Sequence, residues 1–507
     1  MRATLTREPR TLDRSLRAPL AVAVNGTILL LMASTLGAGY LSSWVPSVLG
    51  FPAGAILRDA LSFLLVGLAV VLLATGVRPV RETEAPVTVV LVPLALLTLW
   101  VAILVPFGPS PTASILSVRN LLLFAVVPVA VHSLWRRDLV SARVVMTGFL
   151  VLGAIAAALG LADTMTAGGI VTALGFRRDF AALPQGEPPI ISGAAGALGG
   201  IVRASGGISD ALVFGYLMAL VTLVGIWWSA TLQATGASRR SAALTGLAAA
   251  LAGAALIESL TRGALLAFGV ALVILLILRP TRTMIVSAAL SVGIAIVAVA
   301  LMSSSIPLVA TDSGSEGAAP SSPPAASQAS APAASSAAGN PGQIVIDRIG
   351  SDDPASQLSS QARLDQLKVG ISTLADRPWG TGLGTEGAAA DRAGAAAVKS
   401  TPDIYLMIVA LQTGMPGIIL WLSVAAVSAW WVVRHRSSPA ASLTGAGIGL
   451  LAVASVLSHT PDAPPLSVFL WLLLLGLGAE AAQERLDSPG LGAQPEGRPL
   501  QADPDHR

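Results

Sequence analysis

The sequence predicts an all-α polytopic membrane protein with about 12 transmembrane helices and a long outer loop between the ninth and tenth helices. Hydrophobic residues make up 54% of its 507 residues, and charged residues only 12%, against about 25% charge in an ordinary soluble domain. The apolar residues are gathered in separate stretches, most of them long enough to cross about 30 Å of hydrocarbon. The arginines are concentrated in every second connecting segment, as a multi-pass protein requires.

The apolar stretches define the expected helices. The first follows four arginines but is longer than the apolar part of a signal peptide, so we expect an uncleaved helix. Two stretches, 119–135 and 465–480, are short for a span. The stretches lie at 18–38, 60–76, 86–105, 119–135, 144–162, 208–230, 241–258, 263–279, 283–303, 404–433, 442–458 and 465–480.

The basic residues orient the chain by the positive-inside rule. If the N-terminus is cytoplasmic, 19 of the 31 basic residues fall in inner segments, and the short outer loops are nearly free of them. We therefore expect both termini on the cytoplasmic side of the cytoplasmic (inner) membrane. The inner basic residues are Arg2, Arg7, Arg10, Arg14, Arg17, Arg78, Arg81, Arg136, Arg137, Arg143, Arg239, Arg240, Arg279, Arg282, Arg434, Arg436, Arg485, Arg498 and Arg507.

Four parts follow from this topology: helices 1 to 9 in residues 1–303, the outer loop in 304–402, helices 10 to 12 in 403–480, and a cytoplasmic tail in 481–507. Residues 313–341 are mostly Ala, Ser and Pro, which predicts a disordered tether.

The outer loop changes character after the tether. Apolar residues from Ser356 onwards predict an amphipathic helix that ends before Pro378. The following Gly382-x-Gly384-x-x-Gly387 matches a dinucleotide fingerprint, but no strand precedes it, so a tightly turned loop is expected. The apolar residues of the helix are Leu358, Leu364, Leu367, Val369, Ile371 and Leu374.

Metal and cofactor chemistry has little support in the composition. The chain has no cysteine, and its four histidines are spread along the sequence without forming a cluster. Neither a metal nor another cofactor is expected. The formal net charge of +3 does not indicate a nucleic-acid partner.

Arginines at the outer helix ends are the candidate anion-binding residues. Arg262, in IESLTRGALLAFG, could reach the membrane interface, pair with Glu258 one turn earlier, or fork onto a phosphate. Arg203, in GGIVRASGGISDALVFG, precedes the sixth stretch, where Asp210 can cap the helix. Two arginines from different hairpins could clamp a diphosphate, and Arg119 is a weaker third candidate.

Asp403 opens the tenth stretch in STPDIYLMIVALQTGMPG. It can act locally as a helix N-cap or first-turn acid after Pro402. Alternatively, its carboxylate can take a proton from a sugar hydroxyl.

Four motifs occur in order: RASGGISDALVFGYLMAL, SLTRGALLAFGVALVILL, ARLDQLKVGISTLADRPWGTGLG and PDIYLMIVALQTGMPG. Together with the topology they resemble the bacterial O-antigen ligase and O-antigen polymerase superfamily. The resemblance implies that Arg203 and Arg262 hold the diphosphate of an undecaprenyl-linked glycan. Ligases carry a His-Asn pair eleven residues before the glycine that here is Gly414, and this chain has Asp403-Ile404 there.

The resemblance implies a metal-independent, inverting glycosyltransferase of cell-surface polysaccharide biosynthesis. Its partners would be a polyprenyl-diphosphate-linked glycan donor, a glycan or lipid-sugar acceptor, and membrane lipids. The candidate catalytic residues are Asp403, Arg203 and Arg262, and the candidate substrate-binding residues are Arg203, Arg262, Arg119 and Asp210.

Two other classes of protein stay open. A lipid-linked glycan flippase or secondary transporter also fits twelve helices, although Asn25 and Glu258 are among the few polar residues within spans. A membrane scaffold whose outer loop binds cell-wall polymer is the third possibility. The choice between ligase and polymerase also stays open.

Overall fold

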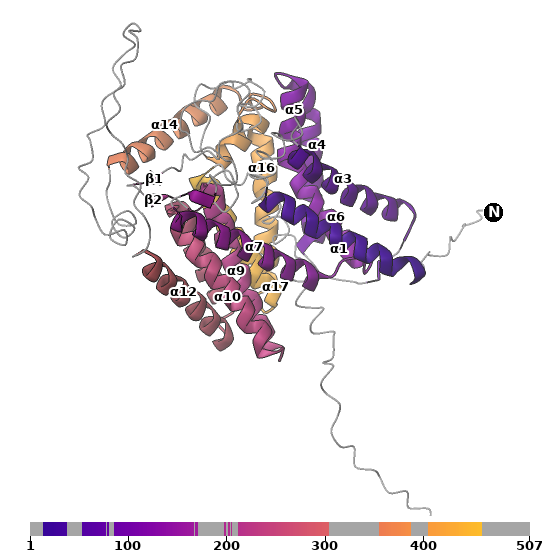
Figure 1. Ribbon diagram of the computed structural model, residues 1–507. Coiled ribbons are helices and arrows are strands. Elements are labelled where there is room, and N and C mark those ends of the chain that lie inside the picture. The colour runs from indigo at the N-terminus through magenta and orange to yellow at the C-terminus, as the bar shows by residue number, and fades with distance from the viewer. Residues whose placement is uncertain are drawn as a thin grey trace, which may run out of the picture.

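Long apolar α-helices form almost all of the structure (Figure 1). The computed structural model describes residues 14–37, 53–77, 79–80, 86–166, 168–170, 197–198, 201–202, 204, 211–303, 354–386 and 404–458. Within these residues, nine helices are long and apolar enough to cross a membrane, or ten if one bent pair counts as a single span. The predicted fold class is therefore confirmed. The count of 12 stays a prediction, and the stretch 465–480 lies outside the described residues.

The helices follow the predicted apolar stretches in order, with ends shifted by a few residues. The helix α11 has 17 residues and is short for a span. The main helices are α1 (Arg14–Leu36), α3 (Ala53–Ala74), α4 (Pro86–Leu104), α7 (Ala142–Met165), α9 (Ala211–Ala234), α10 (Arg239–Glu258), α11 (Arg262–Leu278), α12 (Arg282–Ser303), α16 (Tyr405–Arg434) and α17 (Pro439–Leu457).

The fourth predicted helix, 119–135, is wrong in its start and in its continuity. After the short 3₁₀ helix η1 (Val105–Phe107), the side chain of Ser110 accepts a hydrogen bond from the amide of Ala113 and caps α5 (Pro111–Val118). A π-helical turn, η2 (Arg119–Leu123), joins α5 to α6 (Phe124–Arg136), and the pair is bent by 45°. Such turns are rare and are frequent at functional sites.

The helix α9 is at the centre of the bundle. Of its apolar window, 94% is buried, whereas the corresponding share is 28% in α3 and α4. It packs against α7, α10, α11, α12 and α17. A helix that is apolar on all sides is expected in such a position. Gly225 allows close approach, because a Cβ built there would lie 2.7 Å from the Cβ of Ala249 in α10.

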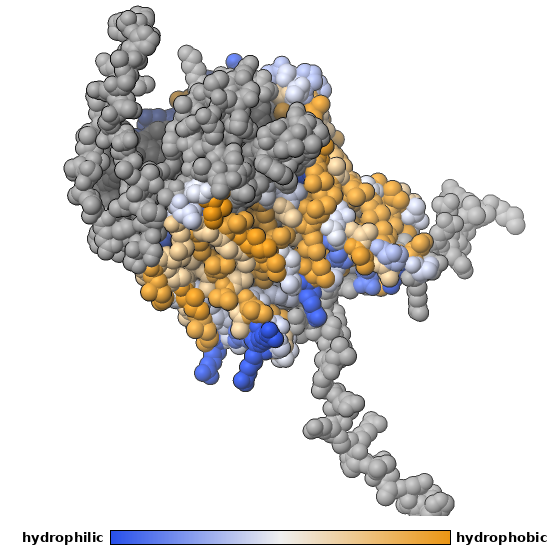
Figure 2. All heavy atoms as spheres, in the orientation of Figure 1, coloured by the Kyte–Doolittle hydropathy of each residue, from blue (hydrophilic) through white to orange (hydrophobic). Residues whose placement is uncertain are grey.

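Three of the basic turns lie at one end of the bundle. The indole of Trp227 near the end of α9 donates to the carbonyl of Pro439 at the start of α17 (2.9 Å), and Arg279 after α11 donates to Thr231 near the end of α9 (3.1 Å). This end carries Arg239, Arg240, Arg279, Arg282, Arg434 and Arg436. Figure 2 shows a hydrophobic surface over the helices and hydrophilic side chains gathered at the lower edge.

The helix α16 is broken at Gly414, whose φ of 70° and ψ of −173° are not helical. Tyr405 and Trp421 are sixteen residues apart, which is about 24 Å along a straight helix. Their ring centroids nevertheless lie 5.8 Å apart in an edge-to-face arrangement. The predicted single helix over 404–433 is therefore two helical pieces, with Pro416 just after the break.

The glycine-rich loop after α14 seals this break. The amide of Met415 donates to the carbonyl of Pro378 (2.8 Å), and the amide of Thr381 donates to the carbonyl of Leu411 (2.6 Å). The indole of Trp100 in α4 donates to the carbonyl of Thr413 (2.8 Å). Broken helices are tolerated in membranes when neighbouring groups satisfy the freed backbone.

Glycine is required where the loop touches its neighbours. Gly380, Gly382 and Gly384 all have positive φ, and a Cβ on Gly384 would lie 2.5 Å from the carbonyl oxygen of Ala113. The expectation of a tightly turned loop is confirmed for Gly382 and Gly384, and Gly387 lies outside the described residues.

The helix predicted in the outer loop is present as α14 (Pro354–Asp376). Gly370 and Leu367 approach α16, where a Cβ on Gly370 would lie 2.4 Å from the sulfur of Met407. Leu364 and Ile371, by contrast, are each 56% exposed. The predicted amphipathic pattern therefore buries only part of its apolar residues within the described structure.

Two further features lie outside the sequence-based expectation. A two-residue antiparallel hairpin, β1 (Ala197–Leu198) and β2 (Ile201–Val202), precedes Ala204. Asn25 in α1 donates to the carbonyl of Leu139 (3.2 Å) and accepts from the amide of Ser141 (3.0 Å). This polar residue within a span ties α1 to the segment before α7.

Candidate functional site

The turn between α10 and α11 places two charged residues at the end of the bundle opposite the basic turns. Glu258 ends α10 and Arg262 begins α11. Between them Leu260 has a φ of +51°, so the helix does not continue and the i, i+4 geometry is lost. Both carboxylate oxygens of Glu258 and the Nη2 atom of Arg262 are buried without a hydrogen-bond partner among the described residues. The alternative of a Glu258–Arg262 ion pair is therefore wrong.

The segment beside Arg203 joins this turn. The amide of Ala204 donates to the backbone carbonyl of Glu258 (3.2 Å), and Ala204 is fully buried. Arg203 and Asp210 lie outside the described residues.

The start of α16 joins the same end of the bundle through α17. The amide of Tyr405 donates to the carbonyl of Ser458 (3.0 Å). The neighbouring residue Leu457 lies against Gly263, where a built Cβ would be 3.8 Å from the Cβ of Leu457. The backbone on either side of Arg262 is thus linked both to Ala204 and to the first residue of α16.

Asp403 lies outside the described residues, two positions before Tyr405. The predicted roles of Asp403, as a helix cap or first-turn acid or as a base, therefore stay predictions. In the described part of the chain, Ile404 occupies the N-cap position of α16 and makes no side-chain cap hydrogen bond.

Tyr216 in α9 is a residue of this region that the sequence reasoning missed. It is fully buried, and a Cβ built on Gly263 would lie 2.6 Å from its hydroxyl oxygen. Gly263 therefore has to be small for α11 to begin beside Tyr216. A second contact between α9 and the start of α11 is made by Thr261, whose hydroxyl donates to the carbonyl of Ala211 (3.3 Å). A single tyrosine within FGYLMAL gives no sequence signal that distinguishes it from a core residue.

Arg119, the third predicted arginine, lies in another polar cluster. Its Nη1 atom is 3.3 Å from Oδ2 of Asp59 in α3, and Nη2 of Arg58 is 3.2 Å from Oδ1 of the same carboxylate. Two guanidinium groups thus share one carboxylate at the π-helical turn. The ion pair with Asp59 gives Arg119 a structural role that the sequence did not reveal.

Metal-binding groups are not assembled in the described part of the chain, where no three His, Asp or Glu side chains come together. The chemistry available there is that of guanidinium, carboxylate, hydroxyl and backbone amide groups. These groups are suited to binding anions and moving protons.

A bundle of apolar helices with buried, unpaired charges at one end defines an integral membrane protein with a polar site at that end. Residues 247–422 match the family model described as O-antigen ligase. The chain is also similar to an O-antigen polymerase from Salmonella muenchen, with 26% identity over 437 residues, which is 84% of this chain and 96% of that protein. Both matches confirm the predicted resemblance to the O-antigen ligase and O-antigen polymerase superfamily.

This similarity supports a role in cell-surface polysaccharide biosynthesis for this multi-pass membrane protein. The family match contains Arg262, the α16 break at Gly414 and the loop that seals it. It begins after Arg203 and Arg119.

Proposed function

We propose that this protein is a metal-independent, inverting glycosyltransferase that transfers or polymerises an undecaprenyl-diphosphate-linked glycan at the outer face of the cytoplasmic membrane. The observation that carries the proposal is the convergence at one end of the bundle. Arg262, with a buried and unpartnered Nη2 atom, lies beside the backbone next to Arg203 and the start of α16 next to Asp403.

The side of the membrane follows from the basic turns. Six arginines lie at the end opposite Arg262, and cytoplasmic loops are enriched in such residues. We therefore assign the Arg262 end to the outer face, where the lipid-linked donor would present its glycan. Both termini would then be cytoplasmic.

The proposed reaction is a displacement at the anomeric carbon of the donor glycan. A hydroxyl oxygen of the acceptor forms the new bond to this carbon, and the bond from carbon to diphosphate oxygen breaks. The electron pair leaves with the diphosphate, and the hydroxyl proton passes to the carboxylate of Asp403. Because attack is opposite the leaving group, the configuration inverts.

Arg203 and Arg262 would bind the diphosphate and stabilise the charge that grows on it during bond breaking. A guanidinium suits this role because it offers two parallel hydrogen bonds to phosphate oxygens. Tyr216, beside the start of α11, would hold this part of the backbone in place. Asp210 and Arg119 would contact the glycan or diphosphate less directly.

The test is transfer by the purified protein. Detergent-solubilised protein is mixed with lipid-linked glycan and an acceptor, and the product is resolved by length and lipid content. Formation of longer lipid-linked chains would identify a polymerase, and transfer of whole chains to a lipid-sugar would identify a ligase. Asp403→Asn should abolish either product, and a fully active Asp403→Asn variant would overturn the assignment of the base.

Lipid-linked glycan transport is the second candidate, because Glu258 is a buried ionisable residue within a helix and transporters use such residues. Reconstituted vesicles distinguish the two functions. A flippase would move intact lipid-linked glycan between leaflets without changing its covalent structure, whereas the proposed enzyme would produce a new glycosidic bond in detergent, where no membrane separates two compartments.

A further inference from the structure

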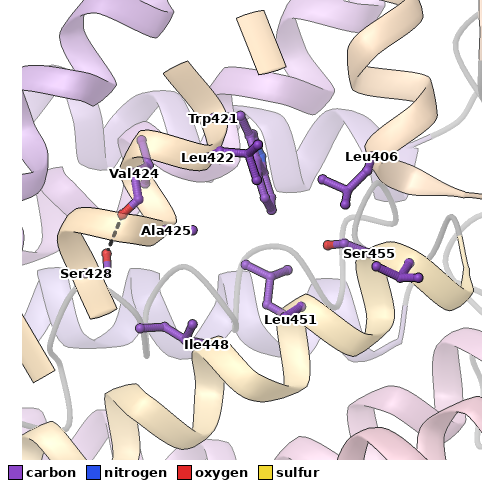
Figure 3. A pocket seen from close by; sticks show the side chains of 11 residues that line it. Leu406, Trp421, Leu422, Val424, Ala425, Ser428, Ile448, Leu451 and Ser455 are labelled. Carbon is purple, nitrogen blue, oxygen red and sulfur yellow. Dashed lines mark hydrogen bonds between the residues drawn. The ribbon is translucent and has the colours of Figure 1, made fainter. Parts of the chain in front are cut away.

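An apolar pocket lies between α16 and α17 (Figure 3). Its volume is about 150 Å³. On α17 its lining runs from Ile448 to Val456, which is about 12 Å of helix at 1.5 Å per residue. Leu406 from the first piece of α16 and Trp421 from the second close its other side, as Figure 3 shows. The break at Gly414 therefore creates the pocket.

The pocket opens toward the surface of the helix bundle. Leu422 and Val456 belong to its lining and are 47% and 53% exposed. In a membrane protein, exposed leucine and valine side chains on apolar helices face hydrocarbon. A lipid chain can therefore enter from the side without crossing water.

Two polar atoms in this apolar lining lack a hydrogen-bond partner among the described residues. They are Nε1 of Trp421 and Oγ of Ser455, both buried. The ring of Trp421 is held edge-on by Tyr405, so its position is fixed. Buried polar groups in a finished core are normally paired, which indicates that this pocket receives a ligand with weak acceptor groups.

One end of the pocket lies next to the candidate site in the chain. Ser455 and Val456 precede Leu457, which lies against Gly263 next to Arg262. Tyr405 precedes Leu406, and its amide donates a hydrogen bond to the carbonyl of Ser458 at the end of α17. A cationic group at one end and an apolar pocket below it match the charge distribution of a lipid with an anionic head.

We propose that this pocket, which we call the α16–α17 groove, binds the polyprenyl chain of the lipid-linked donor next to its diphosphate. The inference rests on the proposed function and adds the location of the lipid. An isoprenoid has a carbon–carbon double bond in every unit, and such bonds accept weak hydrogen bonds from N–H and O–H groups. A saturated acyl chain offers none to Trp421 and Ser455.

The experiment is site-directed photocrosslinking with polyprenyl diphosphate, which carries no glycan. Because the chain has no cysteine, a benzophenone maleimide can be attached to a single introduced Cys in the otherwise native protein. Ala425 lines the groove, and its neighbour Ala426 is exposed on α16 and outside the lining. Ala425→Cys should label radioactive polyprenyl diphosphate strongly, and Ala426→Cys should label it only at background level.

Competition identifies the bound lipid. Unlabelled polyprenyl diphosphate should remove labelling at position 425, and phosphatidylglycerol at the same concentration should not. Equal labelling at positions 425 and 426, or equal competition by both lipids, would overturn the proposal. Crosslinking of position 425 to the segment 465–480 instead of to lipid would also overturn it, by showing that the chain itself fills the groove.

Filling the groove gives an independent test. Ala425→Trp should raise the KM for lipid-linked donor by about tenfold or more, since each excluded methylene costs roughly fourfold in binding. Ala426→Trp should leave KM unchanged. If labelling is absent while transfer is normal, the groove proposal fails and the glycosyltransferase proposal stands. If labelling is specific but the purified protein forms no glycosidic bond, the groove proposal stands and the glycosyltransferase proposal fails.

Discussion

Glu258 and Arg262 lie four residues apart at the α10–α11 turn, yet no ion pair joins them in the described part of the chain. The positive φ of Leu260 interrupts the helix between them, so the i, i+4 geometry of a continuous helix is lost. A buried charge without a partner costs several kcal/mol, and such residues concentrate at functional sites. The missing ion pair therefore makes Arg262 a candidate for binding substrate.

The first prediction separates binding by Arg262 from packing. Arg262→Ala should insert normally but lose about 100- to 1,000-fold in transfer rate, the effect of removing one group that stabilises developing charge. Arg262→Lys keeps the positive charge but loses the two parallel hydrogen bonds of a guanidinium, so its transfer rate should fall less than that of Arg262→Ala. Glu258→Ala should be milder than Arg262→Ala. Transfer rate and thermal stability are measured on the same purified samples.

A structural pair would behave differently. Glu258→Ala and Arg262→Ala would then lose stability to the same extent, with activity falling in proportion to folded protein. Normal transfer by a well-expressed Arg262→Ala protein would remove Arg262 from the site.

The second prediction concerns Asp59, which is shared by Arg58 and Arg119. Asp59→Asn removes the negative charge that Arg58 and Arg119 share, so it should lower stability by about 1–3 kcal/mol. Arg119→Ala should cost less, because Asp59 keeps Arg58. The measurement is the thermal unfolding midpoint in detergent. If Arg119 instead binds diphosphate, Arg119→Ala should reduce transfer strongly while Asp59→Asn preserves it.

The third prediction tests the break in α16. Gly414 has a backbone conformation that is nearly restricted to glycine, and a Cβ there would lie 2.4 Å from the carbonyl carbon of Trp379. Gly414→Ala should therefore cost at least about 1–3 kcal/mol. Gly293 in α12 is the matched control, because a Cβ there meets nothing within 4 Å. Gly293→Ala should be neutral or slightly stabilising; equal unfolding midpoints for both variants would contradict the prediction.

The fourth prediction concerns topology. Single cysteines replacing Gln328, Arg240 and Arg434 can be labelled with a membrane-impermeant maleimide in intact cells, since the native chain has no cysteine. Position 328 should react before permeabilisation, and positions 240 and 434 only after it. Reaction of position 328 only in lysed cells would place the proposed site on the wrong side.

The apolar stretches predicted the helices well because the hydrocarbon thickness sets a length that a sequence shows directly. Arg262 was also accessible, since an arginine between two apolar stretches is conspicuous. The edge-to-face contact of Tyr405 with Trp421 could not be predicted from the sequence. The glycine and proline at positions 414 and 416 predict a break in the helix but not the direction of the bend. The shared carboxylate of Asp59 joins residues 60 positions apart, and no local pattern encodes such a contact.

The loop that seals the α16 break also limits how this protein can be recombined with its relatives. Residues Pro378 and Thr381 provide the hydrogen bonds for backbone groups that Gly414 leaves open. A chimera that exchanges the outer loop up to the start of α16 would separate these partners and place a foreign loop against a native break. An active chimera should therefore have its junction before α14, so that α14, the glycine-rich loop and the first piece of α16 all come from the same parent protein.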